Sequence, residues 1–572
     1  MASHLNGFAA IAKQHTLSTL PKTNNFTSRL PADAEFPTPH SSHTADREDL
    51  GPRMVKGALY TYVRPDPPSR HELLAVSPAA LADLNLDPSC VKDEDFQATL
   101  AGARILTYPD SQEEGKEDKD VIYPWAQCYG GYQFGQWAGQ LGDGRAISLF
   151  EIPTPSARYE LQLKGAGRTP YSRFADGRAV LRSSIREFVV SEALHALGIP
   201  STRALALTLL PDQQVRRERM EPGAIVARFA QTWLRLGTFD LLRARNDRVN
   251  IRRLADYVAE DVFPGWESLP SKLADGDLKD TAMSVTTGVD KLTLEGEGKD
   301  QENRYTRLYR EIVRRNAKTV AAWQAYAFTN GVLNTDNTSV YGLSVDFGPF
   351  AFLDNFDPHY TPNHDDHMLR YSYRNQPSII WWNLLRLGEA LGELIGSGSR
   401  CDEDQFVNEG VAKDWSDELI QRGENIIMKV GDEFKAVFMA EYKRLMTARL
   451  GLKTFKDEDF DVLYSELLDT LEALELDFHH TFRKLSSLSL SQLDTEEKRV
   501  QFAPKFFHSE GLSQTAIPSE NEAKKRIAEW LDKWRLRVLE DWGEGQDEAR
   551  QTVMKKVNPK VSRCPSPYST HC

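Results

Sequence analysis

The sequence NTDNTSVYGLSVDFGPF at residues 334–350 gathers two carboxylates and two carboxamides into a short span. The run before it, AKTVAAWQAYAFTNG, has helical periodicity, and its Gly331 is suited to a helix C-cap. Asp336 and Asn337 are therefore predicted in a loop just after a helix end. Asp346 follows the alternating run SVYGLSVDF, which predicts a short hairpin that ends in Asp-Phe-Gly.

The order of these parts is that of the phosphoryl-transfer site of protein kinases: a base, a metal-binding asparagine, a strand pair and Asp-Phe-Gly. Kinases, however, place four residues between the base and the asparagine. Here Asp336 and Asn337 are adjacent, and no His-Arg-Asp precedes them. An Asx-rich turn followed by a hairpin explains the same residues without any chemistry. Both interpretations stay open for this stretch alone.

Length and composition predict a globular protein of two to four domains, because 572 residues with 40% apolar content can bury large cores. The formal charge of -13 argues against a nucleic-acid partner, since phosphate contacts require a basic face. No apolar run is long enough for a membrane span. Five scattered cysteines without CxxC spacing predict a reducing compartment.

The N-terminal 32 residues have the composition of a transit peptide. They contain no Asp or Glu, are rich in Ser and Thr, and carry apolar residues at helical spacing in LNGFAAIAK. This predicts mitochondrial import, while an unstructured N-terminus of a cytoplasmic protein would look the same. Residues 33–120 are Pro-rich, end in an acidic run, and are predicted to form an N-terminal extension.

A glycine-rich segment, YGGYQFGQWAGQLGDGRAISLFEI at residues 129–152, precedes an apolar strand. Glycines let backbone amides approach phosphate closely. Tight hairpin turns would use the same glycines, and the segment matches neither GxGxxG nor the Walker pattern. The next strand, within YELQLKGAG at residues 159–167, ends at Lys164, where a kinase keeps its strand lysine.

The segment SSIREFVVSEALHALGIP at residues 183–200 is predicted to be a helix capped by Ser184. Its predicted apolar stripe consists of Ile185, Phe188 and Val189. Glu187 in its first turn has two interpretations. It completes a capping box with Ser184, or it forms the ion pair that holds Lys164 on nucleotide phosphates.

Arginines are dense between the lysine and this helix, in GAGRTPYSRFADGRAVLR around Asp176-Gly177. In an acidic protein this density indicates an anion site, although solvated surface charge explains it as well. Two strand-like runs, residues 224–230 and 232–239, then supply Arg228 and Arg235 near an expected hinge between two lobes.

Several long runs together resemble the selenoprotein O family: QLGDGRA, LQLKGAG, TPYSRFADGRAVLRSSIREF, SEALHALGIPSTRAL, NTDN, DFGPFAFLDNFDP and RYSYRNQPSI. The resemblance is dense over about residues 120–400. It implies an α+β, bilobal protein-kinase-like fold with an additional C-terminal helical region. It also implies a protein adenylyltransferase that binds ATP in a flipped orientation, moves AMP onto Ser, Thr or Tyr hydroxyls of protein substrates, and releases pyrophosphate.

Carried over by motif, Asp336 resembles the catalytic base, and Asn337 and Asp346 resemble ligands of Mg²⁺ or Mn²⁺. Glu187 resembles the partner of the strand lysine. The residues that resemble ATP contacts are Gly142, Gly144, Arg145, Lys164, Asp176, Gly177, Arg228, Arg235 and Asp346. A flipped nucleotide explains the extra arginines, because a pyrophosphate leaving group must be neutralised inside the pocket.

Two departures from the family pattern stand out. Tyr132 lies where the family usually has histidine, which could alter substrate handling. The family's redox-active C-terminal pair is closely spaced, whereas Cys564 and Cys572 are eight positions apart with two prolines between them. Whether these two cysteines form a regulatory disulfide stays open.

The predicted organisation places an N-lobe at residues 121–235 and a C-lobe at 236–415 with an acidic insertion at 273–303. A helical extension follows at 416–572. The segments with helical periodicity are 378–394, 416–450, 461–478 and 525–542. Two alternatives remain: a kinase that transfers the γ-phosphate to a protein or small molecule, and a non-catalytic pseudokinase scaffold that binds ATP.

Overall fold

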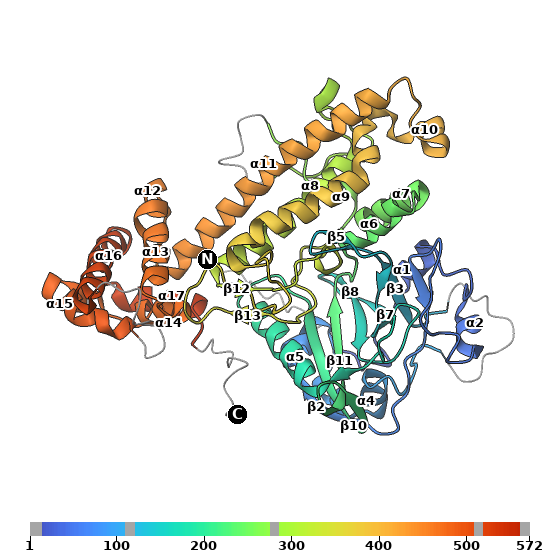
Figure 1. The fold of residues 1–572 in the computed structure, drawn as a ribbon, viewed down its shortest axis with the longest axis horizontal. Helices are drawn as coiled ribbons and strands as arrows, with labels where there is room; N and C mark the ends of the chain where they lie inside the picture. The colour runs from blue at the N-terminus through green and yellow to red at the C-terminus, as the bar shows by residue number, and fades with distance from the viewer. Residues whose placement is uncertain (1–13, 109–120, 275–284, 508–518, 561–572) are drawn as a thin grey trace, which may run out of the picture. The chain divides into compact units, whose positions relative to one another are not determined.

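The computed structural model describes residues 14–108, 121–274, 285–507 and 519–560. The chain divides into two compact units. Unit 1 comprises Met1–His195 and Ser201–Gly265, and unit 2 comprises Ala196–Pro200 and Trp266–Cys572. Unit 1 contains a large antiparallel sheet, and unit 2 is mostly helical (Figure 1). The prediction of a mixed α and β architecture is therefore confirmed. No helix in the described ranges is long and apolar enough to cross a membrane.

The sheet of unit 1 has nine strands in the order β1-β3-β7-β8-β11-β10-β2, with β6 paired to β3 and β9 to β11. Its strands are β1 Tyr60–Tyr62, β2 Glu72–Val76, β3 Trp125–Tyr129, β6 Leu141–Gly142, β7 Ala146–Pro153, β8 Arg158–Lys164, β9 Ala179–Val180, β10 Arg203–Arg216 and β11 Met220–Ala230. A separate small hairpin joins β4 Tyr132–Gln133 to β5 Gln136–Trp137. Both edge strands, β1 and β2, come from the segment predicted as an N-terminal extension.

The sheet has two chemically different faces because side chains alternate along each strand. On β8, Leu161 and Leu163 belong to the hydrophobic core, as do Ala227 and Phe229 of β11. The opposite face of β8 carries Glu160, Gln162 and Lys164, and Arg228 of β11 pairs with Gln162 in register. We call these last four residues the polar face. All four are buried, so this face is enclosed rather than solvated.

Helix α5, Leu181–Ala196, begins before the predicted cap, so Ser184 lies inside the helix. The predicted apolar stripe is also wrong, since Ile185 and Val189 are 43% and 58% exposed. The buried face instead consists of Ser184, Glu187, Val190, Ser191 and Leu194. The reason is electrostatic: Glu187 turns toward the polar face to pair with Lys164, which leaves the aliphatic side chains in solvent.

The rest of unit 1 packs around the sheet. Its helices are α1 Asn25–Arg29, α2 Pro39–Thr44, α3 Pro78–Asp83, η1 Pro88–Lys92, α4 Glu94–Leu100, α6 Leu236–Ala244, α7 Arg248–Tyr257 and η3 Val258–Val262. The strand expected at residues 232–239 is wrong, because Arg235 is the N-cap of α6. Within the predicted leader, Leu17, Leu20, Phe26 and Leu30 are all buried.

Unit 2 is built on three long helices, α8 Arg304–Ala325, α9 Gln376–Gly396 and α11 Ser416–Arg449, which pack against one another (Figure 1). Arg310 of α8 forms an ion pair with Glu433 of α11 at 2.9 Å. The predicted helix at 461–478 is interrupted, whereas that at 525–542 lies within α16. The remaining helical elements are η4 Trp266–Ser268, η5 Gly298–Asp300, η6 Thr335–Asn337, η7 Tyr373–Asn375, η8 Gly398–Asp402, α10 Asp404–Glu409, α12 Asp457–Asp459, η9 Phe460–Ser465, α13 Glu466–Ala473, α14 Phe478–Leu485, η10 Leu490–Leu493, α15 Glu496–Phe502, η11 Ala503–Phe506, α16 Glu520–Trp542 and α17 Asp547–Val557.

The stretch 334–350 is a loop rather than the predicted hairpin. A short ladder brackets it, in which β12 Phe328–Thr329 pairs with β13 Ala351–Phe352. The preceding helix ends at Ala325, so Gly331 is not its cap. Gly331 has φ +82°, and a Cβ there would lie 2.4 Å from the Pro349 carbonyl oxygen. The glycine therefore permits close approach between the two ends of the loop.

Candidate functional site

The strand lysine lies in a buried ionic network on the polar face. Lys164 Nζ is 2.6 Å from Glu187 Oε2, and Glu187 Oε1 is 2.7 Å from Arg228 Nη1. Arg228 also donates to Gln162 Oε1 from Nε at 3.0 Å and from Nη2 at 2.8 Å. Strands β8 and β11 and helix α5 thus bring together residues that are distant in sequence. One carboxylate lies between two cations, which is the predicted ion pair, and Ser184 cannot form the capping box because it lies inside α5.

Two arginines line this region with their charges buried. The Arg228 guanidinium lies 4.2 Å from the Trp233 ring centroid, and the Arg235 guanidinium lies 4.8 Å from that of Tyr129. Arg235 Nη2 is also 3.9 Å from Asp143 Oδ1. Aromatic faces stabilise guanidinium groups at low cost in hydration. The enclosed side of the sheet therefore concentrates positive charge from Arg228, Arg235 and Lys164.

The glycine turn between β6 and β7 packs closely against the loop that contains Tyr171. A Cβ at Gly142 would lie 2.4 Å from the Tyr171 ring, and one at Gly144 would lie 2.9 Å from the Tyr171 carbonyl oxygen. Gly165 N donates to the Arg145 carbonyl at 2.7 Å. These contacts fix the backbone of the turn, while the side chain of Arg145 is exposed. Two amides of the turn are already used, since Asp143 N donates to the Gln127 carbonyl at 2.9 Å and Gly144 N to the Gly142 carbonyl at 2.8 Å, so the turn offers the exposed Arg145 cation to an anionic ligand.

Asp176 and Gly177 lie on the loop that supports the same turn. Gly177 has φ +72°, and a Cβ there would lie 2.3 Å from the Gly167 carbonyl carbon. Asp176 forms an ion pair with Arg217 at 2.8 Å, and the hydrogen bonds from Arg217 hold the pKa of this carboxyl below its ordinary value. Asp176 is therefore ionised at neutral pH and rigidly held.

The dense arginine run around Asp176 is partly neutralised. Arg178 pairs with Asp66, and Arg182 pairs with Glu221 at 2.7 Å. These two arginines are thus engaged in ion pairs within unit 1. Arginine density in the sequence does not by itself identify the anion site, and burial distinguishes Arg228 and Arg235 from this run.

In unit 2, Asp336 and Asn337 lie on the 3₁₀ turn η6 Thr335–Asn337. Asn337 N donates to the Asn334 carbonyl at 3.1 Å, and Asn337 Nδ2 donates to the Val332 carbonyl at 3.3 Å. The second bond orients the carboxamide so that Oδ1 faces away from Val332. Asp346 has φ +55°, a left-handed conformation that aspartate tolerates better than most residues.

Side chains from two helices hold this loop in place. Asn383 of α9 donates to the Leu333 carbonyl at 3.0 Å and to Thr338 Oγ1 at 2.9 Å. Gln376 accepts from Asn330 N at 2.9 Å, and Trp323 of α8 donates to Ser344 Oγ at 2.8 Å. These positioning residues are absent from the sequence-based predictions. A signal was available for Asn383, which interrupts the apolar run SIIWWNLL.

The donor set of the loop fits a hard divalent cation. The Asp346 carboxylate and the Asn337 carboxamide supply oxygen ligands, which Mg²⁺ and Mn²⁺ prefer. No cluster of three or more His, Cys, Asp or Glu residues that could hold a metal occurs within the described ranges. Magnesium sites in ATP-dependent enzymes commonly use one or two carboxylates together with substrate phosphates. The residues present therefore fit an ion shared with a nucleotide.

The family model described as "Protein adenylyltransferase SelO" matches residues 48–566 of the chain. The chain belongs to the SelO family. A Schizosaccharomyces pombe relative, "Protein adenylyltransferase SelO, mitochondrial", is 43% identical over 95% of this chain and 88% of its own length. The Saccharomyces cerevisiae protein of the same name is 38% identical over 89% and 80%. "Protein nucleotidyltransferase YdiU" of Flavobacterium johnsoniae is 34% identical over 95% and 88%. The resemblance inferred from the motifs is thus confirmed.

The cysteines of this SelO family member that the structure describes, Cys90, Cys128 and Cys401, are buried and are not in disulfides. Burial raises the pKa of Cys90 and of Cys128 to about 11, so both thiols are protonated at neutral pH. Cys564 and Cys572, the candidate redox pair, lie outside the described residues.

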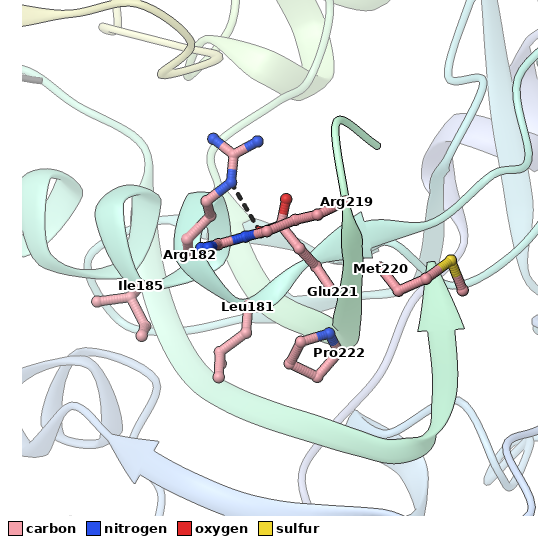
Figure 2. A pocket seen from close by; sticks show the side chains of 7 residues that line it. All are labelled: Leu181, Arg182, Ile185, Arg219, Met220, Glu221 and Pro222. Atoms are coloured by element: carbon pink, nitrogen blue, oxygen red, sulfur yellow. Dashed lines mark hydrogen bonds and ion pairs between the residues drawn. The ribbon is translucent and has the colours of Figure 1, made fainter. Parts of the chain in front are cut away.

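A hollow at the start of α5 lies apart from this set of residues. Figure 2 shows Arg182 of α5 reaching Glu221, with Leu181, Ile185, Arg219, Met220 and Pro222 completing the lining. None of the predicted site residues lines this hollow. Its aliphatic part comes from the outward side of α5, opposite the side that carries Glu187.

Glu160 is a buried carboxyl at the far end of the polar face from Lys164. Its Oε2 accepts from Gln127 Nε2 at 3.3 Å, and its backbone carbonyl accepts from Trp233 Nε1 at 3.2 Å. Burial, reinforced by the nearby Glu151 charge, raises the pKa of Glu160 to about 8. Glu160 is therefore largely protonated at neutral pH, and ionising it requires a charge in an enclosed site.

This raised pKa predicts that stability falls as the pH rises from about 4.5 to about 8. The folded state keeps the Glu160 proton where the unfolded chain has lost it, so the free energy of unfolding falls as pH rises toward about 8. One pKa unit is worth about 1.4 kcal/mol, so the total loss amounts to several kcal/mol. Thermal unfolding of the Glu160→Gln variant between about pH 6 and about pH 9 should show a shallower decline than the parent. Glu218→Gln, at an exposed position of the same unit, is the matched control. Equal slopes in all three proteins would contradict the assignment.

Proposed function

We propose that this chain is an ATP-dependent protein adenylyltransferase that moves AMP from ATP to hydroxyl groups of protein substrates and releases pyrophosphate. The family model and the names of the two yeast relatives support this activity. The structural observation that carries the proposal is a buried set of three cations, Lys164, Arg228 and Arg235, which outnumber the two carboxylates paired with them, Glu187 and Asp143. Three cations at one buried face suit a polyphosphate tail better than an uncharged adenine ring.

In this proposal the polyphosphate enters first, and unit 1 supplies most of the ATP contacts. Lys164, Arg228 and Arg235 would neutralise the β- and γ-phosphates, with Glu187 as the partner that fixes the lysine. Gly142, Gly144 and Arg145 of the glycine turn and the Asp176-Gly177 pair complete the ATP contacts that we assign to unit 1. We also propose a kinase-like fold with an N-lobe at residues 121–235, a C-lobe at 236–415 and an additional helical region after residue 415.

Unit 2 would supply the reacting groups. Asn337 and Asp346 would hold Mg²⁺ or Mn²⁺, which when bound offsets the phosphate charge and polarises the phosphorus centre. Asp336 would accept the proton of the acceptor hydroxyl as its oxygen bonds to the α-phosphorus. The bond from the α-phosphorus to the bridging oxygen breaks, and that oxygen leaves with pyrophosphate. Enclosed cations favour this outcome because they stabilise the leaving group's charge.

We also propose a mitochondrial location, as in the names of the two yeast relatives. The acid-free, hydroxyl-rich N-terminus supports import. Leu17, Leu20 and Phe26 are buried in unit 1. A leader that is removed after import should therefore end before residue 17, because cleavage beyond it would open the core.

A dual-label assay tests the activity. The protein is incubated with a generic protein acceptor and ATP labelled on either the α- or the γ-phosphorus. We expect label on the acceptor from the α position alone, with pyrophosphate as the second product. Transfer of the γ label with release of ADP would indicate a kinase, and no transfer of either label would indicate a scaffold.

A further inference from the structure

Two neighbouring aliphatic residues of unit 2, Met368 and Leu369, are exposed in the segment that precedes helix α9. Met368 is 89% exposed and Leu369 is 41% exposed, although both side chains are apolar. Leu369 also has φ +53°, in the left-handed region that bulky residues rarely adopt. Such a conformation is strained and persists only where the surrounding structure enforces it.

Hydrogen bonds enforce this conformation from both sides. Leu369 N donates to the Asp366 carbonyl at 3.1 Å, and the Leu369 carbonyl accepts from Ser372 N at 3.2 Å and from Asn375 Nδ2 at 2.9 Å. The buried Asp366 carboxylate accepts from Arg370 N at 2.9 Å and Tyr371 N at 2.7 Å. These bonds fix the backbone at Leu369, and the side chains of Met368 and Leu369 are exposed from it.

The same loop is bonded directly to the turn that carries Asp336. Tyr371 OH donates to Asn334 Oδ1 at 2.6 Å, and the Asn334 carbonyl accepts from Asn337 N at 3.1 Å. A second link runs from Asn363 Nδ2 to the Gly331 carbonyl at 3.0 Å. Met368 lies three positions before Tyr371, and a chain of that length spans at most about 11 Å. The Cα atoms of the two residues are therefore within that distance of each other.

We propose that Met368 and Leu369 form an acceptor-recognition pair, which contacts an aliphatic side chain of the protein substrate a few residues from its modified hydroxyl. This inference rests on the proposed adenylyltransferase activity, which requires an acceptor hydroxyl at Asp336. The backbone that carries Met368 and Leu369 is already held by hydrogen bonds, so binding need not order the main chain of this loop. Their fixed link to the Asp336 turn sets the spacing between the aliphatic contact and the reacting hydroxyl.

The test uses synthetic peptides that each carry one central Ser, Thr or Tyr, with leucine or lysine scanned through the flanking positions. In the parent, leucine at one or two flanking positions should raise kcat/KM for transfer of the α label about tenfold over lysine. The double variant Met368→Ser with Leu369→Gly should lose this preference, through a higher KM for peptide and an unchanged KM for ATP.

The variants are chosen so that they should not destabilise the fold. Glycine suits the φ of residue 369 and relieves its strain, so the thermal midpoint should stay the same or rise. Met428→Ser, at a methionine of α11 that is 67% exposed, is the matched control and should keep the leucine preference.

Three outcomes would overturn the inference. The first is transfer of the α label to peptides without any flanking preference, and the second is a preference that survives in the double variant. The third is labelling of protein acceptors but of no peptide, which would show that recognition does not use a short segment. If neither peptides nor proteins receive the α label from the parent, the proposed activity itself fails and the inference fails with it.

Discussion

Replacement of Asp336 by alanine is expected to lower adenylate transfer by about 10²- to 10⁴-fold while ATP affinity stays unchanged. Asp336 is buried on a 3₁₀ turn that Asn334 and Asn383 hold in place. In the proposed reaction it contacts only the incoming hydroxyl, so its loss removes proton acceptance without removing a phosphate contact. Single-turnover transfer of the α label and calorimetry of ATP binding measure the two quantities separately.

The controls for this prediction separate chemistry from folding. Asp336→Asn keeps the size of the side chain and should be as inactive as alanine, because a carboxamide is no base. Asp432→Ala, at an exposed aspartate of α11, should leave transfer unchanged. If the Asp336→Asn variant turned over like the parent, the role of Asp336 as a base would be wrong. If ATP affinity fell as much as transfer, Asp336 would be a structural residue instead.

Replacement of Asp346 by glycine is expected to abolish the magnesium-dependent part of ATP binding and to reduce transfer by about 10³-fold or more. Asp346 has φ +55°, so glycine keeps the backbone conformation while it removes the carboxylate. The effect then reports the lost metal ligand rather than a distorted loop. Calorimetric titration of ATP with and without Mg²⁺ measures it directly.

A second variant tests whether the effect comes from the lost negative charge. Asp346→Asn keeps an oxygen ligand without the negative charge and should lie between the parent and glycine in magnesium dependence. The assignment of Asp346 to the metal would be wrong if the glycine variant bound ATP with the magnesium dependence of the parent.

Sequence patterns were sufficient for the strands of the site but not for the helix beside them. Alternation in YELQLK gave β8 and the position of Lys164, and glycine spacing gave the turn before β7. The face of α5 was predicted incorrectly, because hydrophobic periodicity placed Ile185 and Val189 inward. The ion pairs of Glu187 with Lys164 and Arg228 decide that face, and they form between residues far apart in sequence.

The loop at residues 334–350 shows the same limit in another form. The alternating run SVYGLSVDF has the pattern of a hairpin, yet its polar groups are bonded to Trp323 of α8 and to Pro200. Nearby, Asn383 of α9 bonds the segment that carries Asp336. Local alternation carries no information about such distant partners. The edge strands β1 and β2 were missed for a related reason, since short strands at a sheet edge are defined by their neighbours.

The most direct test of the central claim is the mass of the modified acceptor, measured together with the released nucleotide product. Incubation of the parent with ATP, Mg²⁺ and a protein acceptor should add the mass of one adenylate per modified hydroxyl, with one pyrophosphate released for each. The Asp336→Asn variant should give neither product. A mass increase of one phosphate with an equal amount of ADP would contradict the account.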